Sequence, residues 1–179
     1  MNTPSSGSSP YSTVRVEPAD TSSGFRCGKH PLDDYFKRHA LKNDEANIGR
    51  TYVLRGEQTD PVRVLGFYTL SMAQVVADQV AAHLPGKAPR YPLPAALIGR
   101  LAVDERVHGR RLGEKLLLDA LQRIADAADI LGCVGAIVDA KDEDAERFYQ
   151  KYDITTVYAE TWPRRMFLPI GILKDSLAG

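Results

Sequence analysis

Residues 101–114 combine glycines, arginines and a helix start in one short run, LAVDERVHGRRLGE. The first N–H groups of a helix lack partners within the helix and lie at the positive end of its dipole, so they can bind a phosphate group. Gly109 and Gly113 let the backbone approach a ligand closely, and Arg110 and Arg111 add positive charge. The run is therefore a candidate pyrophosphate site. Taken alone, a G-x-x-x-G spacing more often marks a plain helix start.

This run lies between a predicted central strand, Ala95–Val103, and the clearest predicted helix of the chain. From Leu112 to Ala128, apolar residues recur at three- and four-residue steps, which predicts a helix with a broad packing face. A buried strand over Cys133–Val138 and a helix over Asp142–Tyr152 follow. The second half of the chain thus alternates strands and helices.

The rest of the chain predicts further strands and one earlier helix. The strands cover Tyr11–Pro18, Thr51–Leu54, Val62–Met72, Thr155–Tyr158 and Arg165–Ile170, and the helix, with Pro31 in its first turn, has the apolar face Leu32, Tyr35, Phe36 and Ala40. The polar loop Arg55–Pro61 indicates a hairpin, and the proline-rich residues 85–94 predict a loop or short irregular helices. We expect a disordered tail over residues 1–10, a single domain over residues 11–179, and an α/β or α+β fold with helices packed on a mixed sheet.

Composition excludes little. The 23 basic and 23 acidic side chains balance, so only a local patch could bind nucleic acid. One local excess exists, with six basic residues (Lys87, Arg90, Arg100, Arg106, Arg110 and Arg111) against two acidic ones (Asp104 and Glu105). Two distant cysteines fit no metal-binding spacing, and the N-terminus shows no signal-peptide pattern. We therefore expect a soluble cytoplasmic protein without a metal site or a membrane segment.

The glycine loop resembles motif A of the GNAT acetyltransferase superfamily, a Gln/Arg-x-x-Gly-x-Gly/Ala loop between a central strand and a helix. His108 takes the Gln/Arg position, Arg111 the first glycine position and Gly113 the second. Arginine at the first glycine position removes the option of a positive φ angle. We interpret His108 as a residue that orders the loop and not as a proton carrier.

The similarity extends over residues 15–170 and narrows the family. In order along the chain, the segments FRCG, LD and YF, LGFYTLS, GRLAVD, VDAK and FY at residues 25–28, 32–36, 65–71, 99–104, 138–141 and 148–149 are similar to the GNAT toxins of type II toxin–antitoxin modules. The resemblance implies a GNAT fold with six to seven mostly antiparallel strands and helices on both faces. It further implies acetyl transfer from acetyl-CoA to the α-amine of the amino acid on a charged tRNA.

The resemblance also assigns residues to roles. Tyr149 takes the position of the family's general acid, although its spacing with Ala145, Phe148 and Tyr152 is also that of a core aromatic. The implied acetyl-CoA contacts are the backbone of Leu101, Ala102 and Val103, the loop His108, Gly109, Arg110, Arg111, Leu112, Gly113 and Glu114, and the channel walls Ala145 and Phe148. Candidate contacts to tRNA phosphates are Lys87, Arg90, Arg100, Arg164 and Arg165, each of which could equally be a solvated surface residue.

The resemblance implies a cognate antitoxin as a partner, often of the ribbon-helix-helix type. The chain would contact DNA only through this antitoxin. The resemblance leaves open whether the chain forms a homodimer. No general base is evident, which favours an α-amine with a pKa of about 7.7–8.0 over a lysine amine with a pKa of about 10.4. Two alternatives stay open. One is a GNAT enzyme for a small amine or a protein N-terminus, and the other is a non-catalytic CoA-binding module, which Arg111 would favour.

Overall fold

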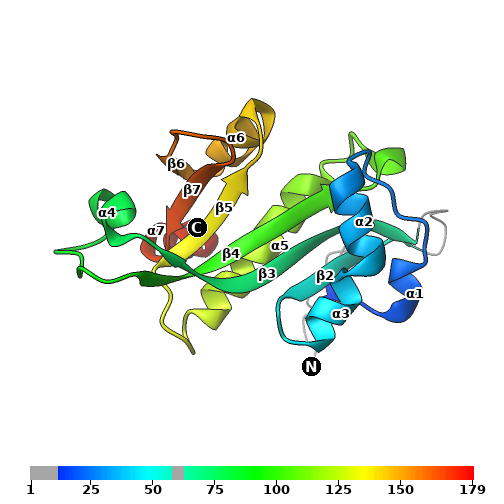
Figure 1. Cartoon of the computed structure of the whole chain (residues 1–179), viewed down its shortest axis with the longest axis horizontal. Helices are drawn as coiled ribbons and strands as arrows, with labels where there is room; N and C mark the ends of the chain where they lie inside the picture. Colours follow the sequence, from blue (N-terminus) through cyan, green and yellow to red (C-terminus); the bar gives the residue numbers. More distant parts are fainter. Residues whose placement is uncertain (1–11, 58–62) are drawn as a thin grey trace, which may run out of the picture. The chain divides into compact units, whose positions relative to one another are not determined.

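Seven strands form one sheet among the residues that the computed structural model describes, which are 12–57 and 63–179. They are β1 (Thr13–Arg15), β2 (Arg50–Arg55), β3 (Val64–Val75), β4 (Leu93–Val103), β5 (Gly135–Ala140), β6 (Thr155–Tyr158) and β7 (Arg164–Pro169), in the order β1-β2-β3-β4-β5-β7-β6 (Figure 1). Strands β4 and β5 are parallel, whereas β1 and β2, β5 and β7, and β6 and β7 pair antiparallel. The predicted mixed, mostly antiparallel sheet is confirmed. The expected tail and part of the Arg55–Pro61 loop lie outside the described residues.

Helices alternate with these strands. They are α1 (Pro18–Thr21), α2 (His30–Arg38), α3 (Ala40–Glu45), α4 (Ala77–Val80), α5 (Leu112–Ala127), α6 (Glu143–Gln150) and α7 (Ile170–Ala178), with short 3-10 helices η1 (Ala81–His83) and η2 (Glu105–Val107). Helix α5 confirms the strongest prediction. Helix α6 is shorter than predicted at both ends. Asp142 is its N-cap, where the carboxylate accepts the N–H of Ala145 at 2.8 Å, and Lys151 is its C-cap.

Several predictions of secondary structure were wrong in detail. Pro18, predicted as the end of a strand, begins α1, and the strand predicted over Cys133–Val138 covers Gly135–Ala140. The single helix expected up to Ala40 is interrupted at His39, which separates α2 from α3. Ile170, predicted as the end of a strand, begins α7. Helices α1, α4, η1 and η2 were not predicted, because three or four residues cannot show a 3.6-residue period. In α7, Gly171 weakens the helical signal.

The described chain forms two compact units. The first comprises the described residues up to 68 together with residues 100–116, and the second comprises residues 69–99 and 117–179. Strands β3 and β4 and helix α5 each contribute residues to both units. No helix among residues 12–57 and 63–179 is long and apolar enough to cross a membrane.

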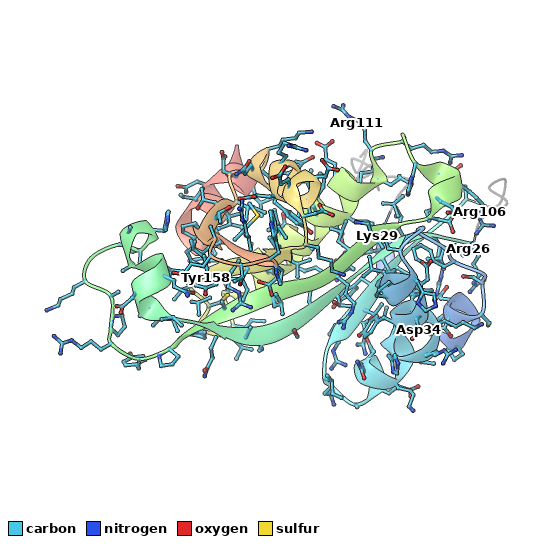
Figure 2. The ribbon with its side chains drawn as sticks, turned by 45° about the horizontal axis from the view of Figure 1, so that its top comes forward. Arg26, Lys29, Asp34, Arg106, Arg111 and Tyr158 are labelled. Carbon is cyan, nitrogen blue, oxygen red and sulfur yellow. The ribbon has the colours of Figure 1, made fainter. Side chains whose placement is uncertain are left out.

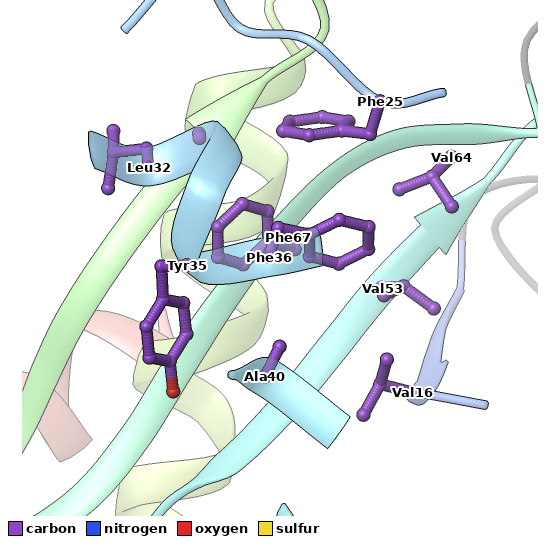
Figure 3. Close-up of a cluster of buried hydrophobic side chains, with 10 residues drawn as sticks. Val16, Phe25, Leu32, Tyr35, Phe36, Ala40, Val53, Val64 and Phe67 are labelled. Atoms are coloured by element: carbon purple, nitrogen blue, oxygen red, sulfur yellow. The ribbon is translucent and has the colours of Figure 1, made fainter. Parts of the chain in front are cut away.

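The core of the first unit centres on three phenylalanine rings (Figure 3). Phe36 of α2 lies 4.7 Å from Phe67 of β3 and 5.0 Å from Phe25, measured between ring centroids. The neighbouring residue Gly66 points to the opposite face of β3, where an added Cβ would lie 2.7 Å from Leu116 of α5. Helices therefore cover both faces of the sheet in this unit, and Gly66 is required for the close approach of α5.

The second unit has its own apolar core, to which β3, α4, β4, β5 and β7 contribute Val75, Ala77, Val80, Leu93, Ala95, Ile137 and Phe167. In β5, an added Cβ at Gly135 would lie 2.3 Å from the Leu168 carbonyl oxygen and 2.6 Å from the Phe167 ring. Only glycine allows β5 and β7 to pair this closely.

Candidate active site

Asp104, directly after β4, is fully buried and anchors the end of that strand. Its carboxylate accepts hydrogen bonds from the backbone N–H, Nε and Nη2 of Arg106, each at 2.9 Å, and from the backbone N–H of Arg26 at 3.1 Å. Burial alone would raise the pKa of Asp104, but these hydrogen bonds outweigh burial and lower it below its usual value. Asp104 is therefore an ionised residue that fixes the start of the glycine loop.

Residues 24–28 lie against this strand end. The N–H of Glu105 donates to the Arg26 carbonyl at 2.8 Å, and the N–H of Asp104 donates to the Leu65 carbonyl at 2.8 Å. Figure 2 shows Arg26 and Arg106 at this end of the first unit. In the sequence, Asp104 stands out only as an acid within a basic stretch and as the last residue of the GRLAVD segment, and neither feature predicts this anchoring role. The available signal was an aspartate directly after a strand, with an arginine two residues later.

The loop from His108 to Arg111 has two residues in the left-handed region, Gly109 with φ of 86° and Arg111 with φ of 58°. The expectation that Arg111 excludes a positive φ is wrong, because the arginine takes the conformation that a glycine would take. His108 orders the loop, since its Nε2–H donates to the Val103 carbonyl at 2.9 Å. A carbonyl oxygen only accepts, so this hydrogen bond requires the proton on Nε2.

The start of α5 has room for an anionic group. No heavy atom lies within 4 Å of an added Cβ at Gly109, and the Arg111 side chain is 87% exposed (Figure 2). Arg111 Nε lies 3.8 Å from Glu114 Oε2, an exposed pair that is weak enough to exchange for a phosphate. The first-turn N–H groups of this 16-residue helix add their donors. The residues present therefore fit the pyrophosphate of a nucleotide cofactor.

The end of β4 extends past its parallel pairing. In the described residues, the ladder with β5 joins Ala96–Ile98 to Ala136–Val138, and β4 continues to Val103. Of the three residues predicted to contact a thioester, Ala102 buries its side chain in the first unit's core, whereas Leu101 and Val103 are half-buried. The Val103 carbonyl is already bound by His108.

Tyr149 lies on α6 in the second unit, together with Ala145 and Phe148. All three are half-buried, and the rings of Phe148 and Tyr149 have centroids 5.2 Å apart. Burial raises the pKa of Tyr149 to about 12, so its hydroxyl is protonated at neutral pH. The side chain is neither a fully buried core residue nor an exposed one, and it carries a proton that it can donate.

The five predicted phosphate contacts differ in their surroundings. Arg100, in the first unit, stacks on the Tyr35 ring at 3.5 Å. In the second unit, Arg164 donates to Glu146 at 2.9 Å, and Arg165 donates to both carboxylate oxygens of Asp139 at 2.9 and 3.0 Å.

Lys87 and Arg90 are exposed in the loop that precedes β4. Arg100, Arg164 and Arg165 are thus engaged with other side chains of the protein, whereas the side chains of Lys87 and Arg90 are exposed to solvent.

Residues 19–153 match the acetyltransferase (GNAT) family. The chain is 35% identical over 167 residues to a tRNA-acetylating toxin of Mycobacterium tuberculosis, covering 92% of this chain and 93% of the relative. It is 31% identical to the probable toxin TacT of Sinorhizobium fredii, covering 89% and 93%. Among solved structures, it is similar to a chain of the KacTA–DNA complex, with a TM-score of 0.75, 26% identity, and coverage of 94% and 98%.

Proposed function

The chain belongs to the acetyltransferase (GNAT) family, and from that premise we propose that it acetylates the α-amine of the amino acid on a charged tRNA and so blocks translation. The observation that carries this proposal is the 35% identity, across 92% of the chain, to a toxin named for acetylating tRNA. The family uses acetyl-CoA, and the residues at the start of α5 fit its pyrophosphate.

Acetyl-CoA supplies the acetyl group as a thioester. The chain's own contributions are an anion site at the start of α5, the backbone of Leu101–Val103 for the cofactor arm, and Ala145 and Phe148 as channel walls. Tyr149 holds a proton at its hydroxyl and donates it to the sulfur as the C–S bond breaks. The non-catalytic alternative loses its main support, because Arg111 adopts the backbone conformation of the glycine that it replaces.

The direct test is incubation with labelled acetyl-CoA and charged tRNA. We expect acetyl-aminoacyl-tRNA as the product, and none from uncharged tRNA, the matched control that lacks the amine. Acetylation of small amines or peptide N-termini, with no acetylation of charged tRNA, would overturn the proposal. It would favour the alternative of a GNAT enzyme for a small amine or a protein N-terminus.

The pH dependence of acetyl transfer follows from the protonation states of the substrate α-amine and of Tyr149. We expect kcat/KM for charged tRNA to rise with pH through about 7.7–8.0, as the α-amine loses its proton, and then to stay level to about pH 10. The general acid must be protonated, and burial moves the pKa of Tyr149 up to about 12, so its ionisation does not lower the rate in this range. A fall in rate between pH 8 and 10 in a protein that stays folded would contradict the assignment.

Arg111 is proposed to contribute charge to the phosphate site at the expense of backbone strain. We expect Arg111→Gly and Arg111→Ala to raise KM for acetyl-CoA by about twofold to fivefold, since an exposed charge contributes less than about 1 kcal/mol. Alanine keeps the unfavourable left-handed conformation, so Arg111→Ala should unfold about 1 kcal/mol more easily than Arg111→Gly. Urea unfolding measures the difference, and equal stability of the two variants would show that no strain is present.

The proposed substrate also indicates where the protein acts and which residues and partners are involved. Charged tRNA is in the cytoplasm, and we place the protein there. We propose Lys87 and Arg90 as the main phosphate contacts. The resemblance to type II toxins supports a cognate antitoxin of the ribbon-helix-helix type as the partner, with DNA reached only through that antitoxin.

A further inference from the structure

Helix α6 is attached to the second unit in part through a charged residue, Glu146. Among its eight residues Glu146 has the least exposed surface, 9%. A helix on a protein core normally buries an apolar stripe. Here Ala145, Phe148 and Tyr149 are each half-buried. The carboxylate of Glu146 thus adds a polar attachment to the half-buried apolar contacts of this helix.

Two strands bind that carboxylate. The hydroxyl of Thr156 on β6 donates to Oε1 of Glu146 at 2.6 Å, and Nη1 of Arg164 on β7 donates to Oε2 at 2.9 Å. The hydrogen bond from Thr156, followed by that from Arg164, lowers the pKa of Glu146, so both hydrogen bonds are to an ionised group. Arg164 also stacks on the ring of Trp162, with its guanidinium carbon 4.1 Å from the centroid, which fixes the donor in turn.

Glu146 and Tyr149 are three residues apart on the same helix, so their side chains leave adjacent turns on one side. Hydrogen bonds require particular distances and directions, so the two bonds to Glu146 fix both the rotation and the position of this turn of α6. A displacement of about 1 Å at a reacting group can cost about 100-fold in rate. The position of the Tyr149 hydroxyl thus depends on how firmly this turn of α6 is held.

We propose that Glu146 is a positioning residue for Tyr149, whose carboxylate, bound by Thr156 and Arg164, fixes the turn of α6 from which Tyr149 projects. This inference rests on the proposed role of Tyr149 as the proton donor. It also assigns Arg164 to the internal support of the site and not to tRNA binding.

The first experiment compares Glu146→Gln with Glu143→Gln. Both change a carboxylate to an amide on α6, but Glu143 is exposed. Glutamine at 146 removes the negative charge. Its oxygen can still accept from Arg164 and its NH2 group can donate to the Thr156 hydroxyl, but neither hydrogen bond is made to a carboxylate, so both are weaker. We expect kcat for acetyl transfer to charged tRNA to fall about tenfold in Glu146→Gln, with KM for acetyl-CoA within twofold of the parent. Glu143→Gln should match the parent in both.

Thr156 provides a second route that leaves the charge in place. Thr156→Val removes the hydroxyl at nearly constant volume and should lower kcat by several-fold. Thr156→Ser keeps the hydroxyl and should restore most of the rate. This pair keeps the proposal testable if Glu146→Gln fails to fold, which circular dichroism and thermal unfolding would reveal. Equal rates for Thr156→Val and Thr156→Ser would overturn it.

The decisive measurement repeats Glu146→Gln in a Tyr149→Phe background. If Glu146 acts through Tyr149, the double variant is no more than twofold slower than Tyr149→Phe alone. A second tenfold loss would show a general structural role and overturn the proposal. A slow Tyr149→Phe with a fully active Glu146→Gln would overturn only this inference. A fully active Tyr149→Phe would refute the role of Tyr149 and, with it, the positioning role.

Discussion

Tyr149→Phe is expected to lower kcat for acetyl transfer about 100-fold and to leave acetyl-CoA binding within twofold of the parent. General acid catalysis contributes about 10²–10⁴-fold, and the lower end applies because a phenol with a pKa of about 12 is a weaker acid than the ideal donor at neutral pH. Removal of the hydroxyl keeps the ring, so the contact with Phe148 at 5.2 Å persists and the fold is unchanged.

Tyr152→Phe is the matched control, since Tyr152 follows α6 and its ring also lies against Phe148, at 5.4 Å. We expect this variant to retain the parental rate. Single-turnover assays with charged tRNA and isothermal titration with CoA separate the chemical step from binding. If Tyr149→Phe acetylates charged tRNA at the parental rate, the proton donor is another group.

Asp104→Ala should cost about 2–3 kcal/mol of unfolding free energy and lower Tm by about 5–10 °C. The substitution removes four hydrogen bonds and leaves the backbone N–H groups of Arg26 and Arg106 without their acceptor. The Arg106 side chain is 49% exposed and regains water, which keeps the loss below that of a fully buried ion pair. Glu105→Ala, at an exposed neighbouring position, should stay within about 0.5 kcal/mol of the parent.

The effect of Asp104 also depends on pH. The pKa of Asp104 is lower in the folded than in the unfolded protein, so its ionised form stabilises the fold above the unfolded value of about 3.9. That contribution is lost as the pH falls from about 4 through the lower, folded value. The difference in stability between the parent and Asp104→Ala should therefore be full at pH 6 and shrink below pH 4. A constant difference down to pH 3 would mean that the charge of Asp104 contributes nothing.

The sequence was most informative where the pattern is long. The apolar repeat predicted α5 almost to its last residue, and the strand before it was placed correctly, because both signals come from many neighbouring residues. The backbone of Arg111 could not be predicted, since the left-handed conformation of an arginine is imposed by the surrounding loop and not by its own preference.

The buried charges were missed for a different reason. Glu146 reads as an ordinary surface acid in the first turn of a helix, because its partners Thr156 and Arg164 come 10 and 18 residues later. Arg164 and Arg165 likewise appear as free cations in the sequence, although the fold brings a carboxylate to each. The roles of these residues depend on contacts between segments that are distant in sequence, and local sequence patterns cannot predict such contacts.

The first unit is discontinuous in sequence, which determines when it can fold while the chain is being synthesised. The N–H of Arg26 donates to a carboxylate 78 residues further along the chain, and residues 100–116 complete the unit that the N-terminal residues begin. A growing polypeptide leaves the ribosome from its N-terminus, so residues 69–99 emerge before this unit can close. The proposed anion site at the start of α5 is thus assembled in the same late step that completes the unit. A nascent chain that ends before residue 100 has neither.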